Sequence, residues 1–237
     1  ANFEGINAEV NVALLPFLFT SLDNARNAWG GDFGAQFAEK LIEPMGFKVL
    51  SIWESGYRHM TNNTRPLEKP EDLKGIKFRT NENSMKVAMY DALDASIVIM
   101  AFSDVYTGLQ NGTIDGQENP LSNIYSSSLQ DVQKYLSLTG HFWTNECLLI
   151  NEKLWESLPE EWQTILQEEV DACETRIREK NIQSDEDLVA KLESEGMEVN
   201  EVDKSAFAEK LQPLYDEWEG KVIGSDLMNA YREYSGY

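Results

Sequence analysis

The chain has 237 residues, of which 42% are hydrophobic, enough to build one large domain or two ordinary ones. It carries 41 acidic and 20 basic residues, and the formal net charge of -21 repels nucleic acid and anionic lipid. We therefore expect no nucleic-acid partner. Because no apolar run reaches the roughly 18 residues of a spanning helix, we also expect no direct membrane insertion.

Side chains that bind metals are scarce. His59 and His141 are the only histidines, and the two cysteines are not clustered. Transition-metal sites need several such ligands close together. The chain also lacks a phosphate-binding loop and a nucleophile elbow. These patterns predict no metal, no cofactor and no catalytic residue.

The first half of the chain predicts alternating strands and helices. Residues 12–19 are apolar but broken at Pro16, which is typical of an edge strand or a strand end. A helix is expected at 32–42, followed by strand, turn and strand within 47–60, with the turn at Gly56. Residues 75–79 predict a strand, 84–93 a helix and 96–100 another strand. This order implies an α/β fold with a largely parallel sheet, whose ligands bind at the carboxyl ends of its strands.

The second half predicts two strands and then mostly helix. The strands are expected at 135–139 and 142–150. Residues 160–195 contain neither Pro nor Gly and predict one long helix. Residues 205–234 are expected to be largely helical, with a kink or restart at Pro213.

Residues 96–120 concentrate the features of a ligand site. An apolar strand leads into a helix that begins near Ser103 and Asp104 and ends at Gly112. The six residues that follow, DGQENP at 115–120, place four hydrogen-bonding side chains in what we predict to be a polar turn. Such loops carry function more often than packing.

The segment at 100–120 resembles the signature of the solute-binding proteins of tripartite ATP-independent periplasmic (TRAP) transporters, M-x-F-S-E-V-Y-x-A-L-Q-x-G-x-x-D-G-Q-E-N-P. Two positions depart from it: Asp104 stands where the family usually has Glu, and Gly108 where it usually has Ala. The likeness continues through residues 15–19, 56–58, 65–66, 73–79 and 133–136, and through Thr139 and His141. It covers almost the whole chain.

The resemblance implies an α/β, two-lobed periplasmic-binding-protein-like fold with a long helix bridging both lobes. Lobe I is expected to comprise residues 1–55 and 144–184, and lobe II residues 56–143 and 185–237. Family members normally have further strands and helices before the point that matches residue 1. We therefore expect the N-terminal part of lobe I to be missing from this chain.

The resemblance also implies the binding residues. The arginine that matches Arg79 holds the carboxylate of the ligand, because a guanidinium offers two parallel N–H donors. Arg58 assists it, Asn119 completes the anion site, and Phe102 packs on the ligand. Glu118 and His141 occupy the places of a supporting network.

Two further side chains, Trp143 and Asn145, are candidates for lining the cleft. Both stand near the start of the strand expected at 142–150. An aromatic residue in a strand is more often part of the core, so that alternative stays open for Trp143. For an isolated arginine such as Arg79, the ordinary alternative is a surface salt bridge.

The predicted function is that of an extracytoplasmic solute-binding protein. Such a protein captures a small organic acid and delivers it to the membrane subunits of a TRAP transporter, acting as a monomer and without enzymatic activity. It works in the periplasm or on the outer face of the bacterial cytoplasmic membrane, with its signal peptide outside this chain. The alternatives are a carbohydrate-active hydrolase that uses Asp115 and Glu118, and an acidic protein-interaction module.

Overall fold

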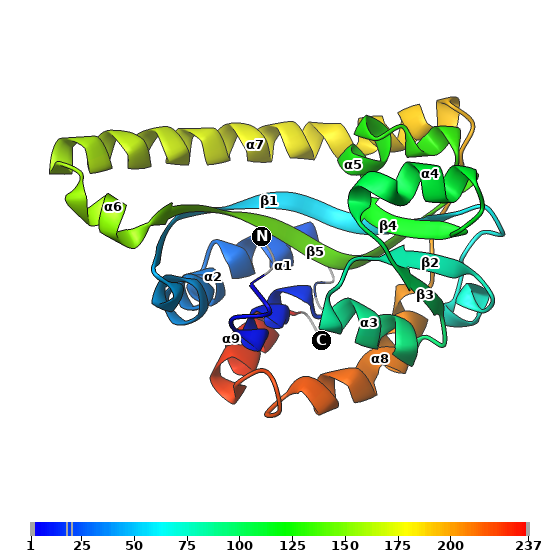
Figure 1. Ribbon diagram of the computed structural model, residues 1–237, viewed down its shortest axis with the longest axis horizontal. Coiled ribbons are helices and arrows are strands. Elements are labelled where there is room, and N and C mark those ends of the chain that lie inside the picture. The colour runs from blue at the N-terminus through cyan, green and yellow to red at the C-terminus, as the bar shows by residue number, and fades with distance from the viewer. Residues whose placement is uncertain (1–2, 18, 20, 236–237) are drawn as a thin grey trace.

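The computed structural model describes residues 3–17, 19 and 21–235. Six strands form one mixed sheet in the order β3-β2-β4-β1-β5-β6, and helices cover both of its faces (Figure 1). Helices α4, α5 and α7 lie on one face in this view, while α1, α2, α3, α8 and α9 lie on the other. The α/β class is confirmed, but the sheet is mixed and not largely parallel. Parallel pairing is restricted to β2 with β3, β2 with β4, and β5 with β6.

Two long antiparallel strands, β1 (Phe47–Asn62) and β5 (Tyr135–Asn151), run through the middle of the molecule. Each was expected to be two strands with a break, and this expectation was wrong. Gly56 and Gly140 have φ of 98° and 56°, and the β1–β5 register shifts beside Gly56. A glycine in this conformation lets a strand take up an extra residue as a bulge and continue.

The parallel part of the sheet is built from β2 (Lys77–Thr80), β3 (Ser96–Ile99) and the connecting helix α3 (Ser84–Ala92). The DGQENP segment, expected to be a polar turn, forms strand β4 (Gly116–Pro120), and all five of its residues are buried. This strand is central because it pairs with β1 on one side and β2 on the other. Its polar side chains are therefore inside the protein, where each needs a partner.

The N-terminal segment is helical and not an edge strand. Residues 8–14 form the 3₁₀ helix η1 (Ala8–Leu14), which Asn7 caps by accepting a hydrogen bond from Glu9 N. No strand follows among residues 15–17 and 19, and residue 18 of the expected strand lies outside the described part. The helix expected at 32–42 is present as α2 (Asp32–Phe37) and the π-helical turn η2 (Ala38–Ile42). Helix α1 (Leu22–Trp29) precedes it and η3 (Glu43–Met45) follows it.

Helix α7 (Glu160–Ser194) confirms the prediction of one long helix and runs along the whole sheet (Figure 1). Gln167 and Asn181 attach it to β1 by donating to the backbone carbonyls of Leu50 and Glu54. The helix does not restart at Pro213, because α8 (Lys204–Trp218) continues through this residue. Proline leaves the carbonyl four residues earlier without its helical partner, here that of Glu209 on the exposed side. The remaining elements are η4 (Pro70–Leu73), η5 (Phe102–Asp104), α4 (Val105–Gln110), α5 (Leu121–Ser126), η6 (Leu129–Asp131), α6 (Glu152–Ser157), β6 (Glu198–Asn200) and α9 (Ser225–Ser235).

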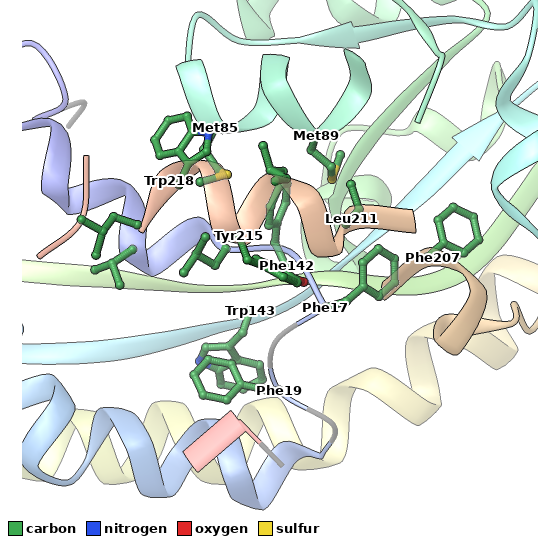
Figure 2. Close-up of a cluster of buried hydrophobic side chains, with 14 of the residues drawn as sticks. Phe17, Phe19, Met85, Met89, Phe142, Trp143, Phe207, Leu211, Tyr215 and Trp218 are labelled. Carbon is green, nitrogen blue, oxygen red and sulfur yellow. The ribbon is translucent and has the colours of Figure 1, made fainter. Parts of the chain in front are cut away.

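The larger hydrophobic core lies between the sheet and helices α3 and α8 (Figure 2). Phe17 stacks on Phe207 with ring centroids 5.3 Å apart, and Tyr215 donates from its hydroxyl to the carbonyl of Pro16. A smaller core under α4, α5 and the end of α7 contains Leu109, Ile124 and Leu192. Among the described residues, no helix is both long and apolar enough to cross a membrane.

Candidate functional site

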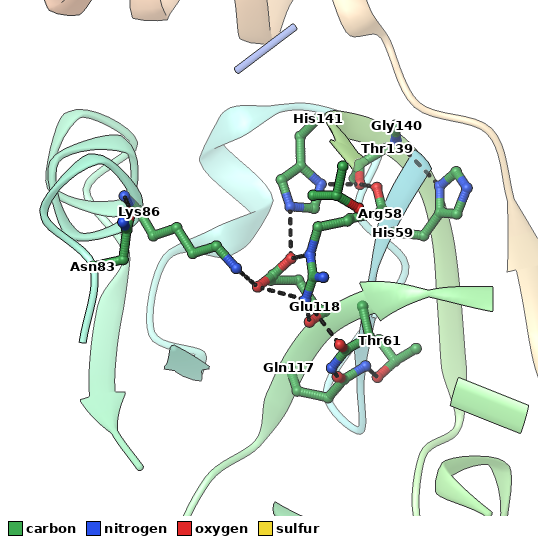
Figure 3. A network of polar contacts seen from close by, with 12 residues as sticks. Arg58, His59, Thr61, Asn83, Lys86, Gln117, Glu118, Thr139, Gly140 and His141 are labelled. Atoms are coloured by element: carbon green, nitrogen blue, oxygen red, sulfur yellow. Dashed lines mark hydrogen bonds and ion pairs between the residues drawn. The ribbon is translucent and has the colours of Figure 1, made fainter. Parts of the chain in front are cut away.

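Four neighbouring strands and one helix bring the candidate binding residues together. Arg58 on β1 lies opposite Pro120 on β4 and Phe142 on β5 in the strand register. This pairing places Arg58 beside residues 118–120 at the end of β4, although about sixty residues separate them in the chain. His141 follows on β5, and Lys86 reaches the same point from the first turn of α3 (Figure 3).

Glu118 is the centre of this cluster, and its side chain is completely buried. Arg58 donates from Nε to Oε2 and, at 3.1 Å, from Nη2 to Oε1. Lys86 Nζ donates to Oε1 at 2.8 Å, and Figure 3 shows its side chain reaching Glu118 from the side opposite Arg58. Burial alone would raise the pKa of the Glu118 carboxyl, but the charges of Arg58 and Lys86 hold that pKa well below its usual range. Glu118 is therefore a permanent anion that holds two cations.

Arg58 also positions the next residue of β4. Its Nη2 donates at 2.8 Å to the backbone carbonyl of Glu118 and at 2.8 Å to Oδ1 of Asn119. The amide nitrogen of Asn119 then donates to Gln117, whose own amide donates to Thr61. A chain of side-chain hydrogen bonds thus fixes the orientation of Asn119, as the supporting role expected for Arg58 requires.

Arg79 is buried, with 5% of its surface exposed, yet only one of its guanidinium nitrogens donates a hydrogen bond to a described residue. Nε donates to the carbonyl of Met100 at 2.9 Å, while Nη1 and Nη2 have no hydrogen-bond partner among the residues that the structure describes. Burial lowers the pKa of Arg79, and the nearby carboxylate of Glu118 partly opposes this effect. The guanidinium carbon lies 5.8 Å from the ring centroid of Phe102, a side chain that is 43% exposed. An oriented pair of donors beside an exposed aromatic ring can receive a carboxylate and the apolar part of its molecule.

His141 is a buried, neutral member of the cluster. Burial lowers its pKa although Glu118 opposes this, and its Nδ1 is 2.7 Å from Oγ1 of Thr139. Its Nε2 lies 3.4 Å from Oε2 of Glu118. The structure thus brings Glu118 and His141 together, and Thr139 sets the orientation of the imidazole ring.

Trp143 and Asn145 are in contact with each other on β5, and Asn145 borders a cavity. Trp143 is buried, packs edge-on against Tyr57 with centroids 5.0 Å apart, and donates from Nε1 to Oδ1 of Asn145 at 3.1 Å. Asn145 lines a cavity of about 210 Å³ whose walls come mainly from η1, α1, α2 and β5. Neither Arg79 nor Arg58 is among its lining residues.

Lys86 is the site residue that sequence reasoning missed. A lysine in the first turn of an amphipathic helix ordinarily faces solvent, and nothing in the local pattern at 84–93 marks this one as buried. The one feature of the sequence that could have pointed to Lys86 is its position. It stands seven residues after Arg79, on the helix that follows the strand of Arg79. Only the packing of α3 against β2 and β4 shows that its ammonium group meets Glu118.

The geometry gives little support to a pair of catalytic carboxylates. Asp115 Oδ2 accepts a hydrogen bond from the backbone N of Lys77 at 2.9 Å, which joins the start of β4 to β2. Glu118 is already held by two cations. Within the described part of the chain, no three His, Cys, Asp or Glu side chains are grouped so that they could hold a metal ion.

Comparison with known proteins decides the family. The model of the bacterial extracellular solute-binding proteins, family 7 (DctP), matches residues 1–221. The chain belongs to this family. A solute-binding protein of Verminephrobacter eiseniae is 39% identical over 94% of this chain and 67% of its own length. The 2,3-diketo-L-gulonate-binding periplasmic protein YiaO of Escherichia coli is 33% identical over 98% of this chain and 71% of its own length.

A solved relative shows the same fold. The crystal structure of a TRAP periplasmic solute-binding protein of Chromohalobacter salexigens with bound D-glucuronate superposes with a TM-score of 0.91 at 33% identity. It covers 98% of this chain and 77% of the other chain. The resemblance to TRAP solute-binding proteins is thus confirmed, and the chain is a non-enzymatic binding protein. It spans about two thirds to three quarters of the length of these relatives.

Proposed function

We propose that Arg79 binds the carboxylate of a small organic acid, which the protein then delivers to the membrane subunits of a TRAP transporter. The unused Nη1 and Nη2 groups of Arg79 are the observation that carries this proposal. A carboxylate can accept hydrogen bonds from both of these nitrogen groups at once, while Nε keeps its contact with the carbonyl of Met100. Asn119 completes the anion site from β4, and Phe102 packs on the body of the ligand.

The ligand class follows from the relatives and from the site together. Two of the relatives bind acidic sugars, 2,3-diketo-L-gulonate in one case and D-glucuronate in the other. Both molecules offer a carboxylate to a cationic site. We therefore assign small organic acids, sugar acids included, as ligands of this chain, and the periplasm as the compartment where it meets them.

The proposal includes two lobes that close on the ligand, with α7 bridging them. In this division, residues 1–55 and 144–184 belong to lobe I, and residues 56–143 and 185–237 belong to lobe II. The positive-φ glycines Gly56 and Gly140, on the two long strands where the chain passes between these segments, support such a division. Helix α9 belongs to the segment assigned to lobe II but packs on α1 and α2 of lobe I, so the end of the chain contacts both lobes. Closure would exclude water from Arg79 and strengthen its contact with the carboxylate.

Isothermal titration calorimetry against a panel of organic acids tests the proposal. The panel contains D-glucuronate, D-gluconate, D-glucarate, succinate and 4-hydroxybutyrate. We expect at least one acid to bind the wild-type protein, and both Arg79→Ala and Arg79→Lys to lower its affinity at least 100-fold. Arg178→Gln is the matched control, because Arg178 is half-exposed and pairs only with Glu174 among the described residues. Unchanged affinity in the Arg79 variants, or no binding to any acid, would contradict the proposal.

The protein is expected to bind as a monomer. Light scattering coupled to size-exclusion chromatography, with and without the bound acid, measures this directly. A ligand-dependent dimer would contradict it.

A further inference from the structure

The cluster around Glu118 holds more positive charge than a single carboxylate can balance. Arg58, Arg79 and Lys86 are cations, each with no more than 12% of its side chain or residue surface exposed. Glu118 supplies one negative charge, and His141 is neutral. The group therefore carries a net charge of about +2 inside a chain whose total formal charge is -21. Binding one monocarboxylate at Arg79 leaves one buried positive charge uncompensated, which is costly at low dielectric.

Lys86 contributes one of these buried positive charges, and not all of its N–H donors form hydrogen bonds. An ammonium group has three N–H donors. One donates to Glu118 Oε1, and no other hydrogen bond to Nζ occurs among the described residues. The group lies 5.7 Å from the ring centroid of Phe142, and its side chain is only 7% exposed. Two N–H donors of this buried ammonium group thus remain for an acceptor that residues 3–17, 19 and 21–235 do not provide.

The position of Lys86 also suits contact with a ligand. Its helix begins at Asn83, whose side-chain amide donates at 2.9 Å to both Glu4 and Asn11 from the N-terminal segment. The first turn of α3 is therefore fixed on two sides. Lys86 contacts Glu118 on β4, and Asn83 contacts Glu4 and Asn11 of the N-terminal segment. A side chain on this turn has a defined direction, as a specificity-determining residue requires.

We infer that Lys86 contacts the ligand and makes this protein select organic acids with two negative charges over otherwise matched acids with one. This inference rests on the proposed function and extends it: Arg79 holds the first carboxylate, and Lys86 receives the second anionic group while keeping its contact with Glu118. A site built around buried donors discriminates strongly against a ligand that leaves one of them unpaired.

Calorimetry on matched ligand pairs tests this selection. D-Glucarate and D-gluconate are linear six-carbon acids that differ in one terminal carboxylate, and succinate and 4-hydroxybutyrate form a shorter pair. We expect the wild-type protein to bind the dianion of one pair at least tenfold more tightly than its partner. Lys86→Met keeps the length of the side chain without its charge, and we expect this ratio to fall at least tenfold. Lys153→Met removes an exposed lysine on α6 and should leave the ratio unchanged.

A second measurement reports contact with the ammonium group itself. Burial lowers the pKa of Lys86 to about 8, with Arg58 and Arg79 acting in the same direction and Glu118 opposing them, while His141 is neutral. At pH 8 the group is about half protonated, and an anion bound beside it draws a proton onto the other half. Binding of the dianion to wild type should therefore take up close to half a proton, measured in buffers of different ionisation enthalpy. Lys86→Met should show almost none.

The outcomes separate this inference from the proposed function. If Lys86→Met weakens both members of a pair equally, or if wild type shows no preference for the dianion, the inference is wrong while the role of Arg79 stands. Preference for a neutral hydroxyl over a second carboxylate would also overturn it. If Arg79→Ala has no effect on either member, the proposed function itself fails. Thermal unfolding of Lys86→Met shows whether the variant is folded, and Lys86→Gln replaces it if it is not.

Discussion

Arg58 Nη2 lies 2.8 Å from the side-chain oxygen of Asn119 and 2.8 Å from the backbone carbonyl of Glu118, so one guanidinium orients two consecutive residues of β4. Through these contacts Arg58 positions its neighbours, whereas two nitrogens of Arg79 have no hydrogen-bond partner in the part of the chain that the structure describes. Arg58 therefore orients residues of β4, while Arg79 is the arginine that we propose to bind the ligand.

Glu118→Gln is expected to lower the free energy of unfolding by about 3 kcal/mol, because it removes the charge that compensates two buried cations. Urea denaturation at pH 7 measures this loss. Glu156→Gln, at an exposed position of α6, is the control and should change stability by less than about 0.5 kcal/mol. Equal stability of the two variants would show that the cluster does not contribute to folding.

The stability difference between wild type and Glu118→Gln should also depend on pH. The folded pKa of Glu118 is well below the unfolded value near 4.5, so its charge contributes stability above about pH 4.5. This contribution is lost as the pH falls below 4.5 toward the folded pKa. The stability difference between wild type and Glu118→Gln should therefore shrink as the pH falls from 4.5 toward the folded pKa of Glu118. A difference that is largest in acid would contradict the assignment.

His59 should oppose folding in mild acid. It is buried, accepts a hydrogen bond at Nδ1 from Gly140 N, and has a pKa lowered to about 3, mainly by burial. The unfolded chain binds a proton at this residue below about pH 6.5, but the folded chain does not, so stability is lost as the pH falls through this window. Between pH 6.5 and 5 the loss is about 2 kcal/mol. Denaturation of wild type and His59→Gln at both pH values should show a loss that is about 2 kcal/mol larger in wild type, because the buried His141 is present in both proteins.

Gly116 allows β4 to approach β1 and β2. A Cβ at this position would lie 2.5 Å from the carbonyl oxygen of Thr61 and 2.8 Å from Cε1 of Phe78. We expect Gly116→Ala to destabilise the protein by about 1–3 kcal/mol through overpacking. Gly5→Ala is the control, since a Cβ there meets nothing within 4 Å. Thermal unfolding compares the two variants, and equal midpoints would contradict the prediction.

Phe102→Ala should weaken ligand binding without a comparable loss of stability. The ring is 43% exposed and lies beside the guanidinium of Arg79, so its truncation removes contact area for the ligand and little core packing. We expect about a tenfold loss of affinity for an acid that binds wild type. Trp162→Ala, on an aromatic side chain 61% exposed on α7, is the control and should bind normally. Calorimetry and thermal unfolding together separate the two effects.

Local sequence predicted the elements whose signals are local. Helix α3, strand β3 and the 35-residue helix α7 follow from apolar spacing and from the absence of Pro and Gly. The strand ends at Gly56 and Gly140 were wrong, because a positive-φ glycine is equally compatible with a turn and with a bulge, and only the neighbouring strand decides between them. For the same reason DGQENP was expected to be a turn, although pairing with β1 and β2 makes it a central strand.

The sequence by itself determined the family, because a long motif with ordered spacing is written in consecutive residues, and the resemblance predicted the residues that we propose to bind an anion. Tertiary structure alone decided that Arg58 donates its hydrogen bonds to Glu118 and Asn119, whereas Nη1 and Nη2 of Arg79 have no partner among the described residues. The contacts of Arg58 join β1 to β4, whose residues lie about sixty positions apart in the chain. Tertiary structure also decided that the ammonium group of Lys86 contacts Glu118. The charge of a lysine is visible in the sequence, but whether water or a buried carboxylate surrounds it depends on how its helix packs.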